Sequence, residues 1–204
     1  MGPSHKIKKI FALTLIIGVT VLAYSASLKN LFVWDDAAVV TDNDFVHSFK
    51  NLPLIFKHSY LTSVKDLDFL GMTFIGSGET SYRPVVTLSY FIDYFLWKLN
   101  PLGYHLTSLF FHVLNVILFY GCMSLLTKRF SMAVYCALLF ALHPVNMEAV
   151  SVISFREDLL AAFFFILSVI VHIQSNYCEG QKKFFLYFFR LFVFLWQNSP
   201  KRWP

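Results

Sequence analysis

Long apolar runs alternate with short polar segments along the chain, and this alternation is its strongest structural signal. A membrane-spanning helix needs roughly 20 mostly apolar residues. Pro144 bends or ends the third run, because proline removes a helical hydrogen-bond donor. The runs cover residues 10–28, 102–127, 131–142, 159–175 and 184–196. The pattern predicts an all-α, multi-span membrane protein with about five apolar helices.

Charge along the chain predicts how these helices are oriented. Only 14% of the residues are charged and 57% are hydrophobic, which is too apolar for a soluble domain. Basic residues gather before the first run and between the second and third runs, and the positive-inside rule places both groups in the cytoplasm. The members are Lys6, Lys8, Lys9, Lys128 and Arg129. We therefore expect a cytoplasmic N-terminus, and we interpret the net charge of +5 as a topology signal rather than a nucleic-acid face. A cleaved signal peptide ending near "AYSAS" is the alternative for the first run.

The polar stretches divide the chain into four parts. Residues 1–28 hold the basic start and the first transmembrane helix, and residues 29–101 form a first lumenal loop with an acidic pair and interfacial helices. Residues 102–176 hold transmembrane helices two to four with a second lumenal loop. Residues 177–204 hold a cytoplasmic loop, the fifth apolar segment and an atypical terminus. The first loop is too long to be a mere connector, so we expect it to be functional.

The segment 82–101 is apolar but short, and Asp93 interrupts it. A charge at the centre of a bilayer costs at least a few kcal/mol. Its many aromatic residues suit the headgroup boundary better than the hydrocarbon core. We therefore predict a helix that lies on the outer surface of the membrane.

Two groups of charged residues are predicted to lie on this outer side. Asp35 and Asp36, in "FVWDDAAVV", directly follow the first span. The second group, between the third and fourth spans, contains Glu148, Arg156, Glu157 and Asp158, and His143 and Arg83 fall on the same side. A carboxylate can accept a proton from an attacking hydroxyl, while Arg or His can stabilise a departing phosphate. The pattern suits group transfer from a lipid phosphate. On spacing alone, a solvated pair that ends a helix is the alternative for the two aspartates.

His105, His112 and Asn115 share one face of the second span, since they lie seven and three residues apart. A metal site would need a third ligand at closer spacing, so we predict hydrogen bonds between helices instead. The three cysteines show no disulfide or zinc spacing, and we expect neither a metal nor another cofactor.

Three stretches of residues 31–168 resemble one family. They are "WDD", "YRPVVTLSYFIDYFLWKLNPLGYHLTSLFFHVLNVILFY" and "LLFALHPVNMEAVSVISFREDLLAAFFFILS". Together they resemble the transmembrane and TPR-repeat-containing O-mannosyltransferases. The resemblance implies a GT-C fold in the endoplasmic reticulum membrane. It also implies transfer of mannose from dolichyl phosphate mannose to Ser or Thr of secretory or membrane proteins.

The resemblance also implies roles for individual residues. Asp35 and Asp36 match the family's catalytic acid in the first lumenal loop, and we favour Asp35 as the base. Arg83 becomes a candidate for binding the carrier's phosphate, with an anchoring cation as the alternative. The residues of the second loop that we expect to line the cavity are His143, Glu148, Arg156 and Asp158. Glu157 departs from the small residue that the family pattern has before the aspartate.

The resemblance ends near Tyr177, and no TPR repeat follows. We therefore expect a truncated or partial enzyme that represents the N-terminal transmembrane part of the family. A non-enzymatic membrane protein, either an inactive isoform or a partner subunit, is the alternative. A transporter with His112, Asn115 and His172 along its path is disfavoured, because the predicted spans carry few charges.

Overall fold

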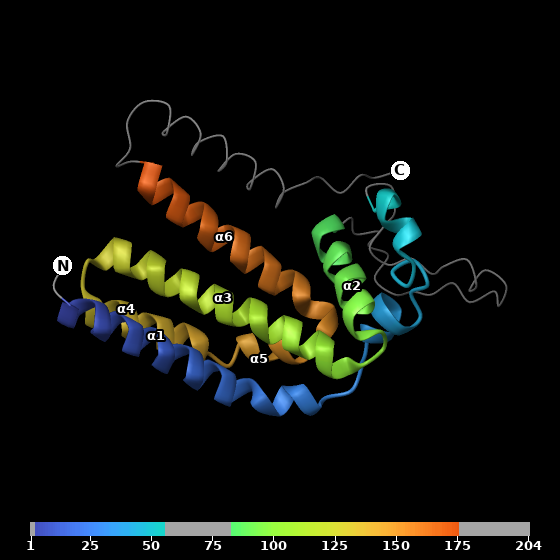
Figure 1. Cartoon of the computed structure of the whole chain (residues 1–204), viewed down its shortest axis with the longest axis horizontal. Coiled ribbons are helices and arrows are strands. Elements are labelled where there is room, and N and C mark those ends of the chain that lie inside the picture. Colours follow the sequence, from blue (N-terminus) through green and yellow to red (C-terminus); the bar gives the residue numbers. More distant parts are fainter. Residues whose placement is uncertain (1–2, 56–82, 176–204) are drawn as a thin grey trace.

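The computed structural model describes residues 3–55 and 83–175, and every regular element in these two ranges is a helix. Helix α1 covers Pro3–Tyr24 and continues into a 3₁₀ helix, Ser25–Lys29. Figure 1 shows α3 (Pro101–Thr127) running lengthwise between α1 and α6 (Arg156–Ser175). Helix α4 (Phe130–Ala141) packs against both α1 and α3. The predicted all-α class is confirmed.

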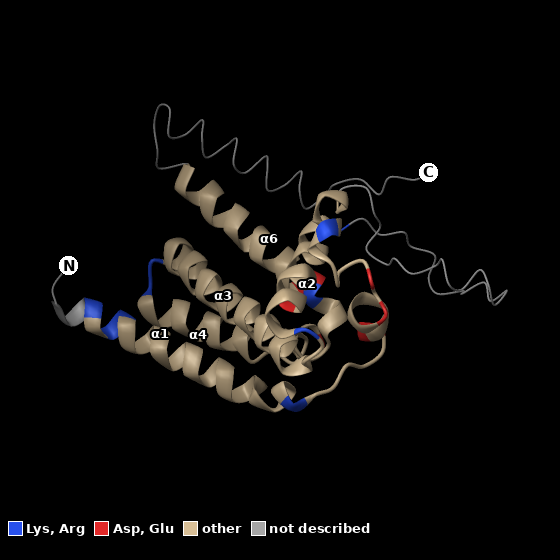
Figure 2. Cartoon of the chain, turned by 45° about the vertical axis from the view of Figure 1, so that its right-hand side comes forward, with Lys and Arg blue, Asp and Glu red and all other residues tan. Residues whose placement is uncertain are grey.

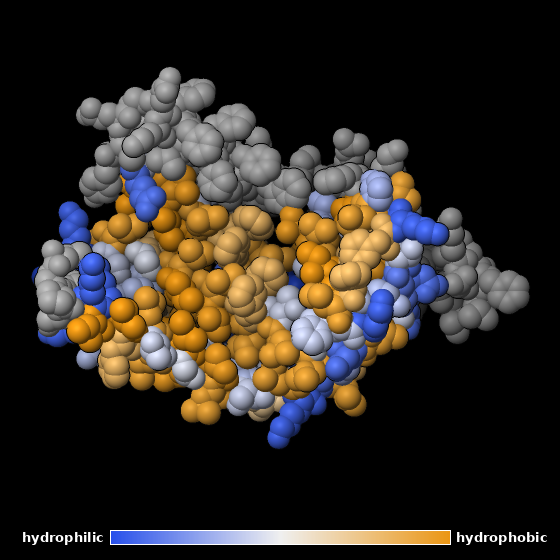
Figure 3. Space-filling view, in the orientation of Figure 1, coloured by the Kyte–Doolittle hydropathy of each residue, from blue (hydrophilic) through white to orange (hydrophobic). Residues whose placement is uncertain are grey.

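Three helical stretches in the described ranges are long and apolar enough to cross a membrane: Lys6–Lys29, Pro101–Thr127 and Ile153–Ser175. Helix α4 is apolar but has 12 residues, which at 1.5 Å per residue is well short of a bilayer core of about 30 Å. Apolar side chains cover the middle of the face in Figure 3, and hydrophilic ones gather toward its two ends. The predicted count of five is not confirmed, and the fifth apolar segment lies outside the described residues.

Helix α3 is the central element, because α1, α2, α4 and α6 all pack against it. The Asn115 side-chain amide donates to the Leu159 carbonyl of α6 at 2.8 Å. His112 Nε2 donates to the Ala141 carbonyl at the end of α4 (3.2 Å), and the Tyr24 hydroxyl of α1 donates to the same oxygen at 3.1 Å. Ala141 is the last residue of α4, so these side chains satisfy a carbonyl that the helix leaves unpaired. The predicted hydrogen bonding between helices is confirmed for His112 and Asn115.

Helix α2 (Pro84–Trp97) lies across the end of this bundle (Figure 1). Its 14 residues are too few to span a bilayer, as its sequence predicted. The more polar face of α2 is turned inward: Ser89 and Asp93 are buried, while Leu88, Ile92 and Phe95 are exposed. An exposed face of this kind is suited to lipid rather than water. Its position on the outer surface stays a prediction.

The first loop folds onto α2 through two further short helices. A π-helix covers Ala37–Thr41 and a 3₁₀ helix covers Phe49–Leu54. Short helices in this loop were predicted. The glycine-rich stretch 71–81 lies outside the described residues, as does the terminal part 177–204.

Candidate functional site

Acidic residues of the described ranges gather at one end of the bundle, beside α2 (Figure 2). The opposite end, where α1 begins and where α3 passes to α4, carries basic residues. The two acidic groups, one after α1 and one between α4 and α6, therefore meet at the same end. Basic residues also occur at the acidic end, so within the described ranges it is the acidic residues that are confined to one end. A basic end without acidic residues is what the positive-inside rule leads us to expect on the cytoplasmic side of a membrane protein.

The turn that carries the two aspartates is built around the carboxylate of Asp36. Its Oδ2 accepts from the Val33 backbone N–H at 3.0 Å, which closes the turn on itself. Its Oδ1 accepts from the Ser154 backbone N–H at 2.7 Å, which attaches the turn to the segment before α6. Asp36 is fully buried, and these two donors compensate for the loss of water around its carboxylate. Asp36 thus joins two loops that are 118 residues apart in sequence.

Asp35 and Trp34 face outward at the same turn. Asp35 is exposed, and its neighbour Asp36 is inside. Trp34 is 77% exposed and has a φ of 50°, a left-handed conformation that costs a non-glycine residue about 1–2 kcal/mol. The hydrogen bond from Val33 to Asp36 spans this residue and stabilises its conformation. The turn therefore presents one free carboxylate next to an exposed indole.

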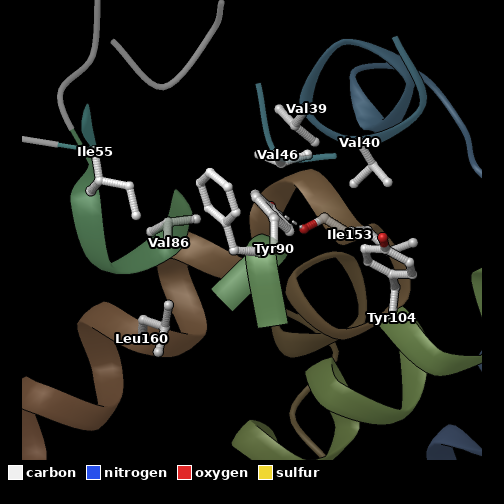
Figure 4. Packing of buried hydrophobic residues seen from close by; sticks show 10 residues of the cluster. Val39, Val40, Val46, Ile55, Val86, Tyr90, Tyr104, Ile153 and Leu160 are labelled. Atoms are coloured by element: carbon white, nitrogen blue, oxygen red, sulfur yellow. Dashed lines mark hydrogen bonds between the residues drawn. The ribbon is translucent and has the colours of Figure 1, made fainter. Parts of the chain in front are cut away.

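Apolar side chains dock the rest of the first loop onto the bundle. Val39, Val40 and Val46 are buried in one cluster with Tyr90 of α2 and Ile153. Figure 4 shows the three valines above Tyr90 and Ile153, with Leu160 further below. The Tyr90 hydroxyl donates to the Ile153 carbonyl at 2.8 Å. The cluster fixes the loop just after the acidic pair.

Arg156, predicted to line the cavity, lies wholly inside the protein. Its guanidinium pairs with Asp93 of α2 at 2.5 Å, and both side chains are buried. It also donates to the Tyr104 carbonyl of α3 at 2.9 Å. The other oxygen of Asp93 accepts from the Thr107 hydroxyl at 2.7 Å. Burial raises the pKa of the Asp93 carboxyl above its ordinary value, while Arg156 and Thr107 act against that rise.

Arg83 stands at the start of α2 and forms an ion pair with Glu157 in the first turn of α6. Both side chains are partly exposed, at 33% and 23%. This pair therefore remains accessible from outside, in contrast to the pair of Asp93 and Arg156. A partly exposed guanidinium can bind a phosphate through two parallel hydrogen bonds, in bidentate geometry.

The remaining predicted residues of the second loop are exposed at the same end. His143 Nδ1 accepts from the Val145 backbone N–H at 3.2 Å, in the turn after α4. Glu148 lies in the short helix α5 (Asn146–Ser151), and Asp158 lies in the first turn of α6. Among the hydrogen bonds and ion pairs found for the described residues, none joins these three side chains to Asp35 or Asp36.

His105 and Asp93 are two members of this region that the sequence did not assign to the site. His105 of α3 is fully buried, and its ring lies near the backbone of Asn30 and Leu31 without forming a hydrogen bond of good geometry within the described part of the protein. The only sign of His105 in the sequence was that it shares a helical face with His112. Asp93 stood out in the sequence as an acid in an apolar helix, but its partner Arg156 could not be identified there. No group of three His, Cys, Asp or Glu residues in the ranges 3–55 and 83–175 is arranged to hold a metal ion.

Comparison with known proteins identifies relatives of this chain. No protein-family model matches it, and no solved structure matches it. Protein O-mannosyl-transferase TMTC3 of Homo sapiens is 34% identical over 166 residues, which are 80% of this chain and 17% of that protein. Protein O-mannosyl-transferase TMTC1 of Mus musculus is 34% identical over 174 residues, 83% of this chain and 18% of that protein. Protein O-mannosyl-transferase F38B6.6 of Caenorhabditis elegans is 30% identical over 168 residues, 80% of this chain and 23% of that protein.

The chain spans about one-fifth of the length of these relatives. The similarity extends over about four-fifths of this chain. The predicted resemblance is confirmed: the chain is a homologue of the TMTC family of protein O-mannosyl-transferases, matching an N-terminal part of them.

Proposed function

We propose that this chain forms the catalytic end of a GT-C glycosyltransferase in the endoplasmic reticulum membrane. It would transfer mannose from dolichyl phosphate mannose to Ser or Thr hydroxyls of secretory-pathway proteins. One observation carries the proposal: in a homologue of O-mannosyl-transferases, a turn at the acidic end exposes Asp35 and anchors it through buried Asp36.

Asp35 is our candidate for the general base. In an inverting displacement, the acceptor oxygen bonds to C1 of mannose while the bond from C1 to the phosphate oxygen breaks. The dolichyl phosphate leaves with the electron pair, and the hydroxyl proton passes to a carboxylate. Exposed Asp35 can receive this proton, whereas both carboxylate oxygens of Asp36 already accept backbone N–H groups. Asp36 then acts by holding its neighbour.

Arg83 is our candidate for the phosphate of the donor. It is partly exposed, it lies at the same end as Asp35, and Glu157 compensates its charge in the absence of ligand. The phosphodiester of the donor carries one negative charge, as the carboxylate does, whereas the dolichyl phosphate that leaves is a monoester and gains a second charge, so the guanidinium binds the leaving group more strongly. We propose that His143, Glu148 and Asp158 line the surrounding cavity. Their exposure at this end supports that role.

Transfer of labelled mannose in microsomes that contain the chain tests the proposal. Asp35→Asn should lower transfer by roughly 100-fold or more, the range for a general base. Asp44→Asn is a matched control, since Asp44 lies in the same loop with its side chain 99% exposed. Equal transfer by both variants would refute the role of Asp35. Transfer by a longer gene product but not by this chain would favour the alternative, a non-enzymatic membrane subunit.

A further inference from the structure

The segment between α5 and α6 connects the acidic turn to the bundle. Ile153, in a 3₁₀ helix of three residues, accepts a hydrogen bond from the Tyr90 hydroxyl. The next residue, Ser154, donates its backbone N–H to Asp36. Arg156, two residues further, starts α6 and reaches inward. Contacts that fix the position of Arg156 therefore also fix the backbone N–H of Ser154, which donates to the Asp36 carboxylate.

The side chain of Arg156 makes contacts with two other helices. Asp93 and Ser89 contact it from α2, with the Ser89 hydroxyl at 3.3 Å. The Tyr104 carbonyl and the Ser108 hydroxyl contact it from α3, at 2.9 and 3.4 Å. These four groups account for most of the five N–H donors of a guanidinium. The side chain is fully buried, so no face of it is open to a ligand.

An aromatic ring completes this enclosure. The guanidinium carbon lies 4.8 Å from the centre of the Tyr90 ring, within the range of a cation–π contact. Tyr90 is the residue whose hydroxyl binds the Ile153 carbonyl. Tyr90 therefore contacts the segment twice, once through its ring and once through its hydroxyl.

We infer that Asp93 and Arg156 form a positioning pair that holds the turn of Asp35 and Asp36 against α2 and α3. The pair fixes the start of α6, and this places the Ser154 N–H where the Asp36 carboxylate accepts it. Arg156 is then not a ligand of the donor's phosphate. The consequence for sugar transfer rests on the proposed function, whereas the attachment of the turn does not.

Reactivity of buried cysteines tests the attachment without any measurement of transfer. Val40→Cys reports on the first loop, and Val150→Cys in α5 is its matched control. Both valines are fully buried at this end of the bundle, in two separate clusters. The full chain in lipid nanodiscs, with its three native cysteines replaced by alanine, is labelled with a small maleimide.

Asp93→Asn or Arg156→Gln should each raise the labelling rate of Val40→Cys by roughly tenfold or more, because each leaves a buried group without its partner. The rate of Val150→Cys should change much less. The double variant should label Val40→Cys more slowly than the product of the two single effects predicts, since the two residues act as one unit. Protection of Val40→Cys in both single variants would overturn the inference, and so would an equal rise at Val150→Cys.

Kinetics of an active preparation separate positioning from phosphate binding. A positioning pair requires that both single variants lower kcat while the KM for dolichyl phosphate mannose stays nearly unchanged. A rise in KM with Arg156→Gln but not with Asp93→Asn would instead identify Arg156 as a phosphate ligand and refute the pair. Should the chain transfer no mannose at all, the labelling result still decides whether the pair holds the turn.

Discussion

Replacement of Asp36 by alanine should destabilise the protein, whereas the same change at Asp35 should not. The two residues are adjacent and chemically identical, so they form a matched pair. Asp36 is fully buried and accepts two backbone N–H groups, at 3.0 and 2.7 Å. Asp35 is exposed at the surface of the same turn.

The two hydrogen bonds set the size of the effect. A bond to a charged acceptor contributes about 1.5–3 kcal/mol to stability. In Asp36→Ala, the N–H of exposed Val33 can regain water, but the N–H of buried Ser154 loses this acceptor, which costs about 1–3 kcal/mol. Loss of the carboxylate also removes its own desolvation cost, so we expect a net loss of about 2–4 kcal/mol. Asp36→Asn keeps one acceptor oxygen and should lose about half as much.

Unfolding in mixed micelles, followed by the fluorescence of the four tryptophans, measures this difference. The denaturant concentration at the midpoint of unfolding should fall clearly for Asp36→Ala, less for Asp36→Asn, and hardly at all for Asp35→Ala. If Asp36→Ala and Asp35→Ala share one midpoint, the assignment of Asp36 as the anchor of the turn is refuted. A drop confined to Asp35→Ala would show that the outer carboxylate is the structural one.

Three further predictions concern the bundle and its orientation. Gly103→Ala should destabilise the protein by about 1–3 kcal/mol, because a Cβ there overlaps the Trp97 side chain; unchanged thermal unfolding would contradict this. Tyr24→Phe should cost only about 0.5–1.5 kcal/mol in the same measurement, since the last carbonyl of α4 keeps its second donor; a larger loss would show that the two donors depend on each other. Leu61→Asn completes an Asn-Thr-Ser acceptor for N-glycosylation. If the first loop is lumenal, this variant should be glycosylated in microsomes and gain apparent mass on a gel, and an added Ser63→Ala change should abolish the gain. Absence of the gain in mass would contradict the predicted orientation.

The helices were the most predictable part of this protein. Apolar periodicity and length placed a helix over 102–127, and the structure has Pro101–Thr127. Its start also has a local signal, because the Asn100 side chain accepts from the Leu102 N–H at 3.2 Å and a proline stands in the first turn. The short span of α4 agrees with the expected break at Pro144. Such features depend on neighbours in sequence, so a sequence pattern can reveal them.

The partners of the charged residues were not predictable in this way. Asp93 in an apolar segment indicated a surface helix, yet the structure buries its carboxylate against Arg156, 63 residues later. Either residue alone carries a charge that is costly to bury, and only the tertiary pairing makes the position favourable. The donor to Asp36 left no signal at all, because it is the backbone N–H of Ser154, a group that almost every residue has.

The acidic pair gains its significance from the opposite directions of its two side chains. An exposed carboxylate is accessible to substrate, but exposure alone leaves it free to move. A base must be held within about 0.5 Å of its working position, so it needs support from groups that are themselves fixed. Asp36 gives this support from the adjacent position, and the segment that binds it is held in turn by Tyr90 and Arg156. A single aspartate at this turn could be accessible or anchored, whereas two in succession allow one to be anchored while the other works.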